Sequence, residues 1–168
     1  MTANPAGKRD EGQGRFKQMQ ARIIQSGQEE HLERMAHIDS VESGFGLVSQ
    51  EECSLPQFLE ELLRASGMTC SQLARKACVN TTFVYDIFKG KSRPGRDNAL
   101  MLAFALNCNV SKTQYLLRLA GAAALWPSIR RDVIIAWHIA HGCTREECDD
   151  ELYRLGETTL LKPGIGLD

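Results

Sequence analysis

The chain has 168 residues, 43% of them hydrophobic, and a formal net charge of −1 at neutral pH. This length suits one ordinary domain or a small domain with helical additions, and the composition argues against a chain that is disordered throughout. No apolar run approaches the roughly 18 residues of a membrane-spanning helix, and the start of the chain lacks the apolar core of a secretory signal, so we expect a cytoplasmic protein with no membrane partner.

Charged residues are distributed unevenly along the chain. Residues 55–125 contain 9 basic and 4 acidic residues, whereas residues 1–54 contain 6 and 9, and residues 126–168 contain 5 and 8. The central segment therefore has a net charge of +5 between flanks of −3 each. A basic middle is the layout expected of a small nucleic-acid binder, and ordinary surface charge explains it equally well.

The potentially reactive side chains do not form the pattern of a metal site or an active site. No two of the six cysteines have C-x-x-C spacing, so we expect free thiols, several of which fill the core. His138 and His141 lie on one side of a predicted helix without a third ligand nearby, and we expect no metal and no cofactor. Because no phosphate-binding loop, carboxylate pair or nucleophile motif is present, we do not expect an enzyme.

The N-terminal part predicts a tail followed by helices. Residues 1–14 carry Pro, Gly and mixed charge with almost no apolar side chains, which is typical of a flexible tail. Residues 15–54 contain apolar residues at helical spacing and then a glycine-containing stretch. We interpret them as a helical extension and a linker.

Residues 55–121 predict five short helices joined by tight turns. Three side-chain pairs have the spacing of a capping box, in which each residue of the pair accepts a hydrogen bond from the other's backbone N–H at the start of a helix. They are Ser54 with Gln57, Thr69 with Gln72, and Ser111 with Gln114. Asn80 can cap the third helix, and the strongly apolar residues 98–106 form the fourth. Helices this short and this closely spaced form an all-α globule.

The C-terminal part predicts a helical hairpin over residues 126–157 and a tail over residues 158–168. Ser128 can cap its first helix, and Thr144 with Glu147 is a further capping box that starts its second. The hairpin is acidic and is apolar on one side, with Trp137 among the apolar residues. It can serve as a dimerisation element or pack over the central helices, and the sequence leaves both open.

Residues 69–90 have the pattern of a helix-turn-helix motif. Ala74 lies where two short helices pack most closely, and Val79 in the turn fills the gap between them. Val84 and Ile87 face inward from the second helix. The remaining face of that helix is free to enter the major groove of DNA, which is wide enough to admit one helix.

Residues 55–119 resemble the Cro and phage-repressor type of helix-turn-helix regulators, the XRE family. The resemblance is carried by the lead helix, the inward positions just named, and the exit Gly90-Lys91-x-Arg93-Pro94. It implies an all-α fold, in which a five-helix repressor-like DNA-binding domain is here joined to N-terminal helices and a C-terminal hairpin. It also implies a sequence-specific regulator of transcription that binds double-stranded DNA.

The resemblance also implies which residues contact DNA. The helix after the turn looks like the recognition helix, and its outward side chains are Thr81, Thr82, Tyr85 and Asp86. Thr69 and Cys70 lie where the N-terminus of the preceding helix meets a phosphate, which its free N–H groups favour. The phosphate contacts implied in and after the exit loop are Lys89, Lys91, Arg93 and Arg96.

Three positions depart from the family pattern. Cys78 stands at the start of the turn, where the family usually has Gly because the backbone tends towards positive φ. Cys70 replaces a frequent Gln, and Asp86 repels phosphate although it can accept a hydrogen bond from a cytosine amino group. A helix-turn-helix scaffold that has become a protein–protein interaction adaptor is therefore the alternative function. Because one such domain covers half of a typical operator, we expect a homodimer.

Overall fold

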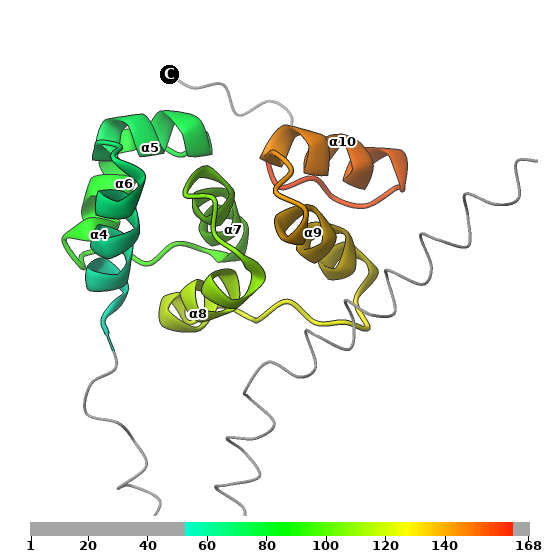
Figure 1. Ribbon diagram of the computed structural model, residues 1–168, viewed down its shortest axis with the longest axis horizontal. Helices are drawn as coiled ribbons and strands as arrows, with labels where there is room; N and C mark the ends of the chain where they lie inside the picture. Colours follow the sequence, from blue (N-terminus) through cyan, green and yellow to red (C-terminus); the bar gives the residue numbers. More distant parts are fainter. Residues whose placement is uncertain (1–52, 163–168) are drawn as a thin grey trace, which may run out of the picture. The chain divides into compact units, whose positions relative to one another are not determined.

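Within residues 53–162, the computed structural model contains seven helices and no strand. They are α4 (Leu55–Ser66), α5 (Cys70–Ala77), α6 (Thr81–Phe88), α7 (Arg96–Ala105), α8 (Val110–Ala120), α9 (Arg130–Ala140) and α10 (Arg145–Arg154), as Figure 1 shows. The predicted all-α class is confirmed. The N-terminal tail and helices predicted over residues 1–52 lie outside the described residues, as do residues 163–168.

Four of the predicted helix starts are confirmed. Capping boxes start α4, α5 and α10, where the N-cap hydroxyls accept hydrogen bonds from backbone N–H groups three residues ahead. The N-cap residues are Ser54, Thr69 and Thr144. At α6, Asn80 Oδ1 accepts a hydrogen bond from the Phe83 N–H at 3.1 Å. Each of these caps satisfies an N–H group that the helix itself leaves without a partner.

Two predicted caps are wrong because turns shift the helix starts. Asn107 has a φ of +51° and ends the turn after α7, so that Asn109 is the N-cap of α8 in place of Ser111. Asn109 Oδ1 accepts a hydrogen bond from the Lys112 N–H at 2.8 Å. At α9, the Ile129 N–H donates to the Trp126 carbonyl at 3.1 Å, which encloses Ser128 within a turn and leaves Ile129 as the N-cap.

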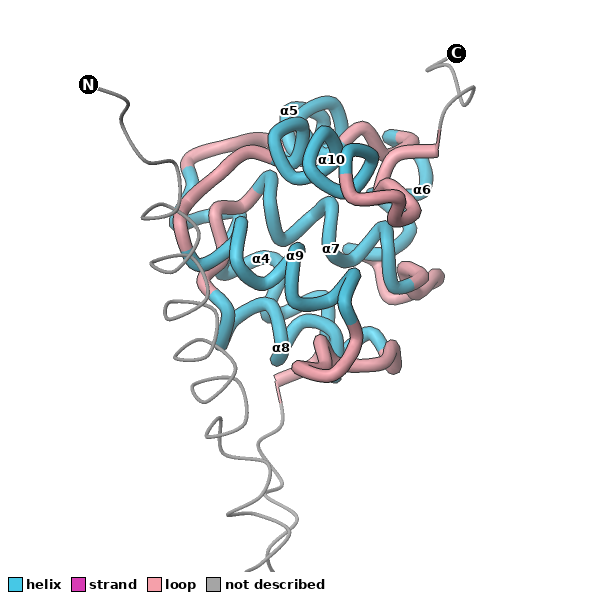
Figure 2. The backbone as a smooth tube through the Cα atoms, turned by 90° about the vertical axis from the view of Figure 1, so that its right-hand side faces the viewer, coloured by secondary structure: helices cyan, strands magenta, loops and turns pink. Residues whose placement is uncertain are grey.

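Helix α7 is the centre of the fold. All of its residues from Ala99 to Ala105 are buried, which explains why the predicted fourth helix is apolar on every side. It begins at Arg96, two residues before the predicted start, because the extended Gly95 is its N-cap. Figure 1 shows α4, α5 and α6 on one side of α7, and α9 and α10 on the other. Figure 2 is viewed from the side of α9 and α10, which therefore face the viewer.

The C-terminal hairpin packs on the central helices. The apolar side of α9, including the residues from Val133 to Ala136, is buried, and α9 and α10 contact α8 and α7. Two ion pairs join α9 to the start of α7: Arg96 with Asp132 at 2.7 Å, and Arg131 with Asp97 at 3.0 Å. The apolar face of α9 is therefore used within the chain. None of the helices between residues 53 and 162 has the length and apolarity to span a bilayer.

Candidate nucleic-acid interface

Small and branched side chains hold α5 and α6 against each other. Ala74, Val84 and Ile87 are completely buried, and Val79 is nearly so. The Val79 N–H donates to the Ala74 carbonyl at 3.0 Å, which folds the turn back onto α5. A larger side chain in place of Ala74 would force α6 away from α5. The predicted inward positions of the motif are confirmed.

Cys78 begins the turn in a left-handed conformation, with φ of +55° and ψ of +38°. This confirms the expectation that the turn needs a positive φ. A side chain in this conformation costs on the order of 1 kcal/mol relative to glycine, so the surrounding contacts must compensate for it. One of them comes from the C-terminal hairpin, because Arg145 Nη2 donates to the Cys78 Sγ at 3.8 Å.

The outward face of α6 is polar. Thr81 and Thr82 are exposed in its first turn, where each offers a hydroxyl and a methyl group. One turn later, the hydroxyl of the exposed Tyr85 is 3.2 Å from the Ser71 Oγ, a hydrogen bond that joins this face to the start of α5. Asp86 is half-exposed, and no residue between 53 and 162 forms an ion pair with its carboxylate.

The N-terminus of α5 adjoins the Tyr85 hydroxyl. Thr69 is exposed, and its hydroxyl accepts a hydrogen bond from the Gln72 N–H at 3.2 Å. The N–H groups of Cys70 and Ser71 have no partner among the described residues. Burial raises the pKa of the Cys70 thiol, so this side chain offers a neutral group. The backbone donors are therefore better suited to an anion than the thiol is.

The loop that leaves α6 carries three exposed cationic side chains, those of Lys89, Lys91 and Arg93. None of them forms an ion pair or a side-chain hydrogen bond with another described residue. The path of the loop is fixed by its backbone, since the Asp86 carbonyl accepts hydrogen bonds from the N–H groups of Lys91 at 2.8 Å and Ser92 at 3.2 Å. These cations thus remain available to a negatively charged partner.

A comparison with protein families matches this region. Residues 59–111 match the model of the Cro/C1-type HTH DNA-binding domain. The segment is a Cro/C1-type helix-turn-helix domain. It extends from within α4 to the start of α8 and contains α5, the turn and α6. No curated protein and no solved structure was found to match the chain.

Arg96, in the same Cro/C1-type domain, is engaged differently from the loop cations. Its guanidinium donates to both carboxylate oxygens of Asp132, at 2.9 and 2.7 Å, and to the carbonyls of Ala123 and Ala124. The predicted phosphate contact at Arg96 therefore competes with an ion pair to a buried carboxylate. This guanidinium joins α7 to the hairpin.

The arginines that follow the Cro/C1-type domain are paired as well. Each arginine of residues 126–162 has a carboxylate within 4 Å of its guanidinium. The pairs are Arg130 with Glu157, Arg131 with Asp97, Arg145 with Asp149 and Glu146, and Arg154 with Glu151. Lys89, Lys91 and Arg93 in the loop after α6 differ from these arginines in forming no ion pair with a described residue. Among residues 53–162, no group of three or more His, Cys, Asp or Glu side chains could hold a metal ion.

Sequence reasoning missed two features of the Cro/C1-type domain. The Ser71–Tyr85 hydrogen bond joins residues 14 positions apart. The contact between Arg145 and Cys78 joins residues 67 positions apart. The hydrogen bond between Ser71 and Tyr85 had only a weak signal in the sequence, namely a polar residue at the second position of α5. Nothing in the local sequence indicated the contact between Arg145 and Cys78.

Proposed function

We propose that this protein is a sequence-specific transcriptional regulator that binds double-stranded DNA in the cytoplasm and has no enzymatic activity. The observation that carries the proposal is the exposed polar face of α6 beside three exposed, unpaired cations of the following loop. The match of residues 59–111 to a DNA-binding domain supports it.

In this proposal α6 lies in the major groove. Its inward residues Val84 and Ile87 are buried, so the opposite, polar face points away from the core. Thr81 and Thr82 then face base edges, where a hydroxyl can donate or accept a hydrogen bond and a methyl group can contact thymine. Tyr85 lies beside them, held by Ser71.

Phosphate contacts position the domain on the duplex. We assign them to Lys89, Lys91 and Arg93 in the loop, and to the free N–H groups of Cys70 and Ser71 at the start of α5. A helix N-terminus and cationic side chains on either side of a recognition helix can hold the two backbones that flank a groove. The proposal does not depend on Arg96, which binds Asp132.

The loop cations give the proposal a salt dependence. We expect the affinity for any duplex to fall steeply with salt, and each phosphate contact to add about 0.9 to the slope of log affinity against log salt. Lys91→Ala and Arg93→Ala should each weaken specific and random duplexes alike and lower the slope by about that amount. Fluorescence anisotropy from low to high salt measures this. The control is Lys112→Ala, which removes an exposed lysine at the start of α8 and should leave the slope unchanged. If Lys91→Ala and Arg93→Ala also leave the slope unchanged, the loop does not contact the DNA.

A protein-interaction adaptor is the second candidate function. It is favoured by Asp86, whose carboxylate lies on the outward side of α6 without a partner among residues 53–162. A carboxylate on a DNA-facing surface repels phosphates and gains energy only at a matching cytosine. The two functions differ in whether substitutions on α6 change binding to DNA.

We also propose that the regulator is a homodimer, because two domains double the contacts that one recognition helix makes. The apolar face of α9 is buried within the chain, so the dimer must use another surface. Trp126 and Ile129, which precede α9, are 56% and 49% exposed. Large exposed apolar side chains, Trp above all, are frequent energetic centres of interfaces.

Sedimentation velocity tests this assembly. We expect the full chain to sediment as a dimer at tens of micromolar, and the double variant Trp126→Gln, Ile129→Ser to raise the dimer dissociation constant by at least about tenfold. Tyr153→Gln, which changes a more exposed aromatic residue on α10, should have no effect. A monomeric wild type would contradict dimerisation, and a double variant that behaves like the wild type would contradict this surface.

A further inference from the structure

Arg145 connects the C-terminal hairpin to the helix-turn-helix. It is the first residue of α10, and only 10% of its side chain is exposed. Nη2 donates to the Cys78 Sγ at 3.8 Å and to Glu146 at 2.7 Å, while Nη1 donates to Asp149 at 2.6 Å. The guanidinium thus lies at the C-terminal end of α5, where unpaired carbonyls favour a positive charge.

Asp149 connects the same guanidinium to the end of the described chain. Its Oδ1 accepts a hydrogen bond from the Leu160 N–H at 2.6 Å, and its Oδ2 accepts one from the Leu161 N–H at 3.2 Å. The side chain of Leu160 is buried. One carboxylate therefore holds both Arg145 and the backbone of residues 160–161.

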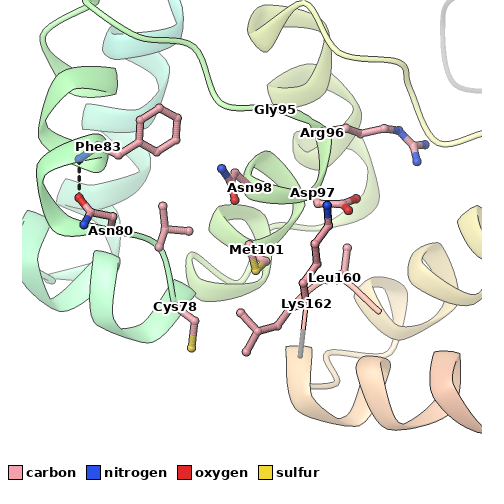
Figure 3. A pocket seen from close by; sticks show the side chains of 12 residues that line it. Cys78, Asn80, Phe83, Gly95, Arg96, Asp97, Asn98, Met101, Leu160 and Lys162 are labelled. Atoms are coloured by element: carbon pink, nitrogen blue, oxygen red, sulfur yellow. Dashed lines mark hydrogen bonds between the residues drawn. The ribbon is translucent and has the colours of Figure 1, made fainter. Parts of the chain in front are cut away.

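The helix-turn-helix turn and this C-terminal segment lie on opposite sides of a cleft of about 570 Å³. Figure 3 shows Cys78 and Asn80 on one side, and Leu160 and Lys162 on the other. Phe83 of α6 also lines the cleft. The start of α6 is consequently not packed against the C-terminal segment across this gap, and the contact between Arg145 and Cys78 joins α10 to the turn directly before α6.

We propose that Arg145 and Asp149 are positioning residues for the helix-turn-helix turn. They fix Cys78 in its left-handed conformation and so set the angle at which α5 presents α6. Arg145 needs its carboxylate partner because a buried cation without one is unfavourable. The effect on DNA rests on the proposed function, whereas the effect on the turn does not.

Residue-resolved alkylation by iodoacetamide, read by peptide mass spectrometry, tests the effect on the turn in the full chain. We expect Asp149→Asn to accelerate the alkylation of Cys78 roughly tenfold, because Cys78 is only half-exposed and local opening of the turn increases the access to its thiol. Cys108 serves as the monitor of global unfolding, because it is buried and burial raises its pKa to about 11. Its alkylation should not change.

The matched control is Glu146→Gln, which removes the exposed partner of the same guanidinium and should leave Cys78 unchanged. If Asp149→Asn does not fold, Arg145→Lys takes its place, since a lysine retains the charge but cannot reach Asp149 and Cys78 together. Unchanged alkylation of Cys78, or a parallel rise at Cys78 and Cys108, would overturn the proposal.

Binding to DNA is measured on the same variants. We expect Asp149→Asn to lose about tenfold in affinity for a selected duplex and little for a random one, because a displaced α6 loses base contacts before phosphate contacts. Glu146→Gln should bind as the wild type does. If Asp149→Asn accelerates the alkylation of Cys78 but not of Cys108, and the wild type binds no DNA, the positioning of the turn is upheld and the proposed function is overturned.

Discussion

Replacing Asp132 by alanine is expected to lower the free energy of unfolding by about 3–5 kcal/mol, a large part of the stability of a domain this size. Its carboxylate is 1% exposed and accepts three hydrogen bonds, two from Arg96 and one from the Trp126 N–H at 2.9 Å. The alanine leaves these donors without their partner in a part-buried site. Urea unfolding followed by circular dichroism measures the loss.

Glu157→Gln is the matched control for this prediction. It breaks the ion pair with Arg130, which spans 3.7 Å and is largely exposed on the Arg130 side. Exposed pairs of this kind contribute about 1 kcal/mol or less. Equal destabilisation by Asp132→Ala and Glu157→Gln would show that Asp132 does not join the hairpin to α7 in solution.

Replacing Thr82 by alanine is expected to lower the affinity for a selected duplex by about 1–3 kcal/mol and to relax specificity at the base pair that Thr82 contacts. The substitution removes the hydroxyl from an exposed position in the first turn of α6, where no core contact is lost. Affinity for a random duplex should hardly change. Titration of both duplexes measures the difference, with Thr158→Ala, an exposed threonine after α10, as the control.

Asp86→Asn should act in the opposite direction on random DNA. The carboxylate repels phosphates in every sequence and gains energy only at a matching cytosine. The neutral amide should therefore raise the affinity for a random duplex and reduce the preference for the selected one. Equal and weak binding of both duplexes by the wild type, Thr82→Ala and Asp86→Asn would favour the protein-interaction adaptor.

The helix caps and turn contacts that were predicted correctly depend on residues that lie a few positions apart in the sequence. Thr69 caps α5 because its partner Gln72 is three residues away, and Ala74 and Val79 meet within the same turn. The positive φ of Cys78 followed from the family pattern. The start of α8 was wrong because Asn107, two residues before the N-cap, adopts a left-handed conformation that its sequence does not require.

The features that could not be predicted join distant segments. Arg96 looked like a phosphate contact because it follows Lys91 and Arg93 in a basic stretch. Its partner Asp132 lies 36 residues later, and only the packing of α9 on α7 brings the two together. The same holds for Arg145 and Cys78, which are 67 residues apart. A local pattern gives the charge of a side chain but not the carboxylate that neutralises it.

Selection of bound sequences from a random pool of duplex DNA, with the purified full chain, tests most directly whether α6 reads a sequence. DNA recognition by Thr81, Thr82 and Asp86 predicts enrichment of a shared motif, arranged as two related half-sites if the protein is a dimer. Selection with Thr82→Ala should recover the motif with one position relaxed. Recovery of unrelated sequences by the wild type, no different from a pool treated without protein, would contradict sequence-specific binding.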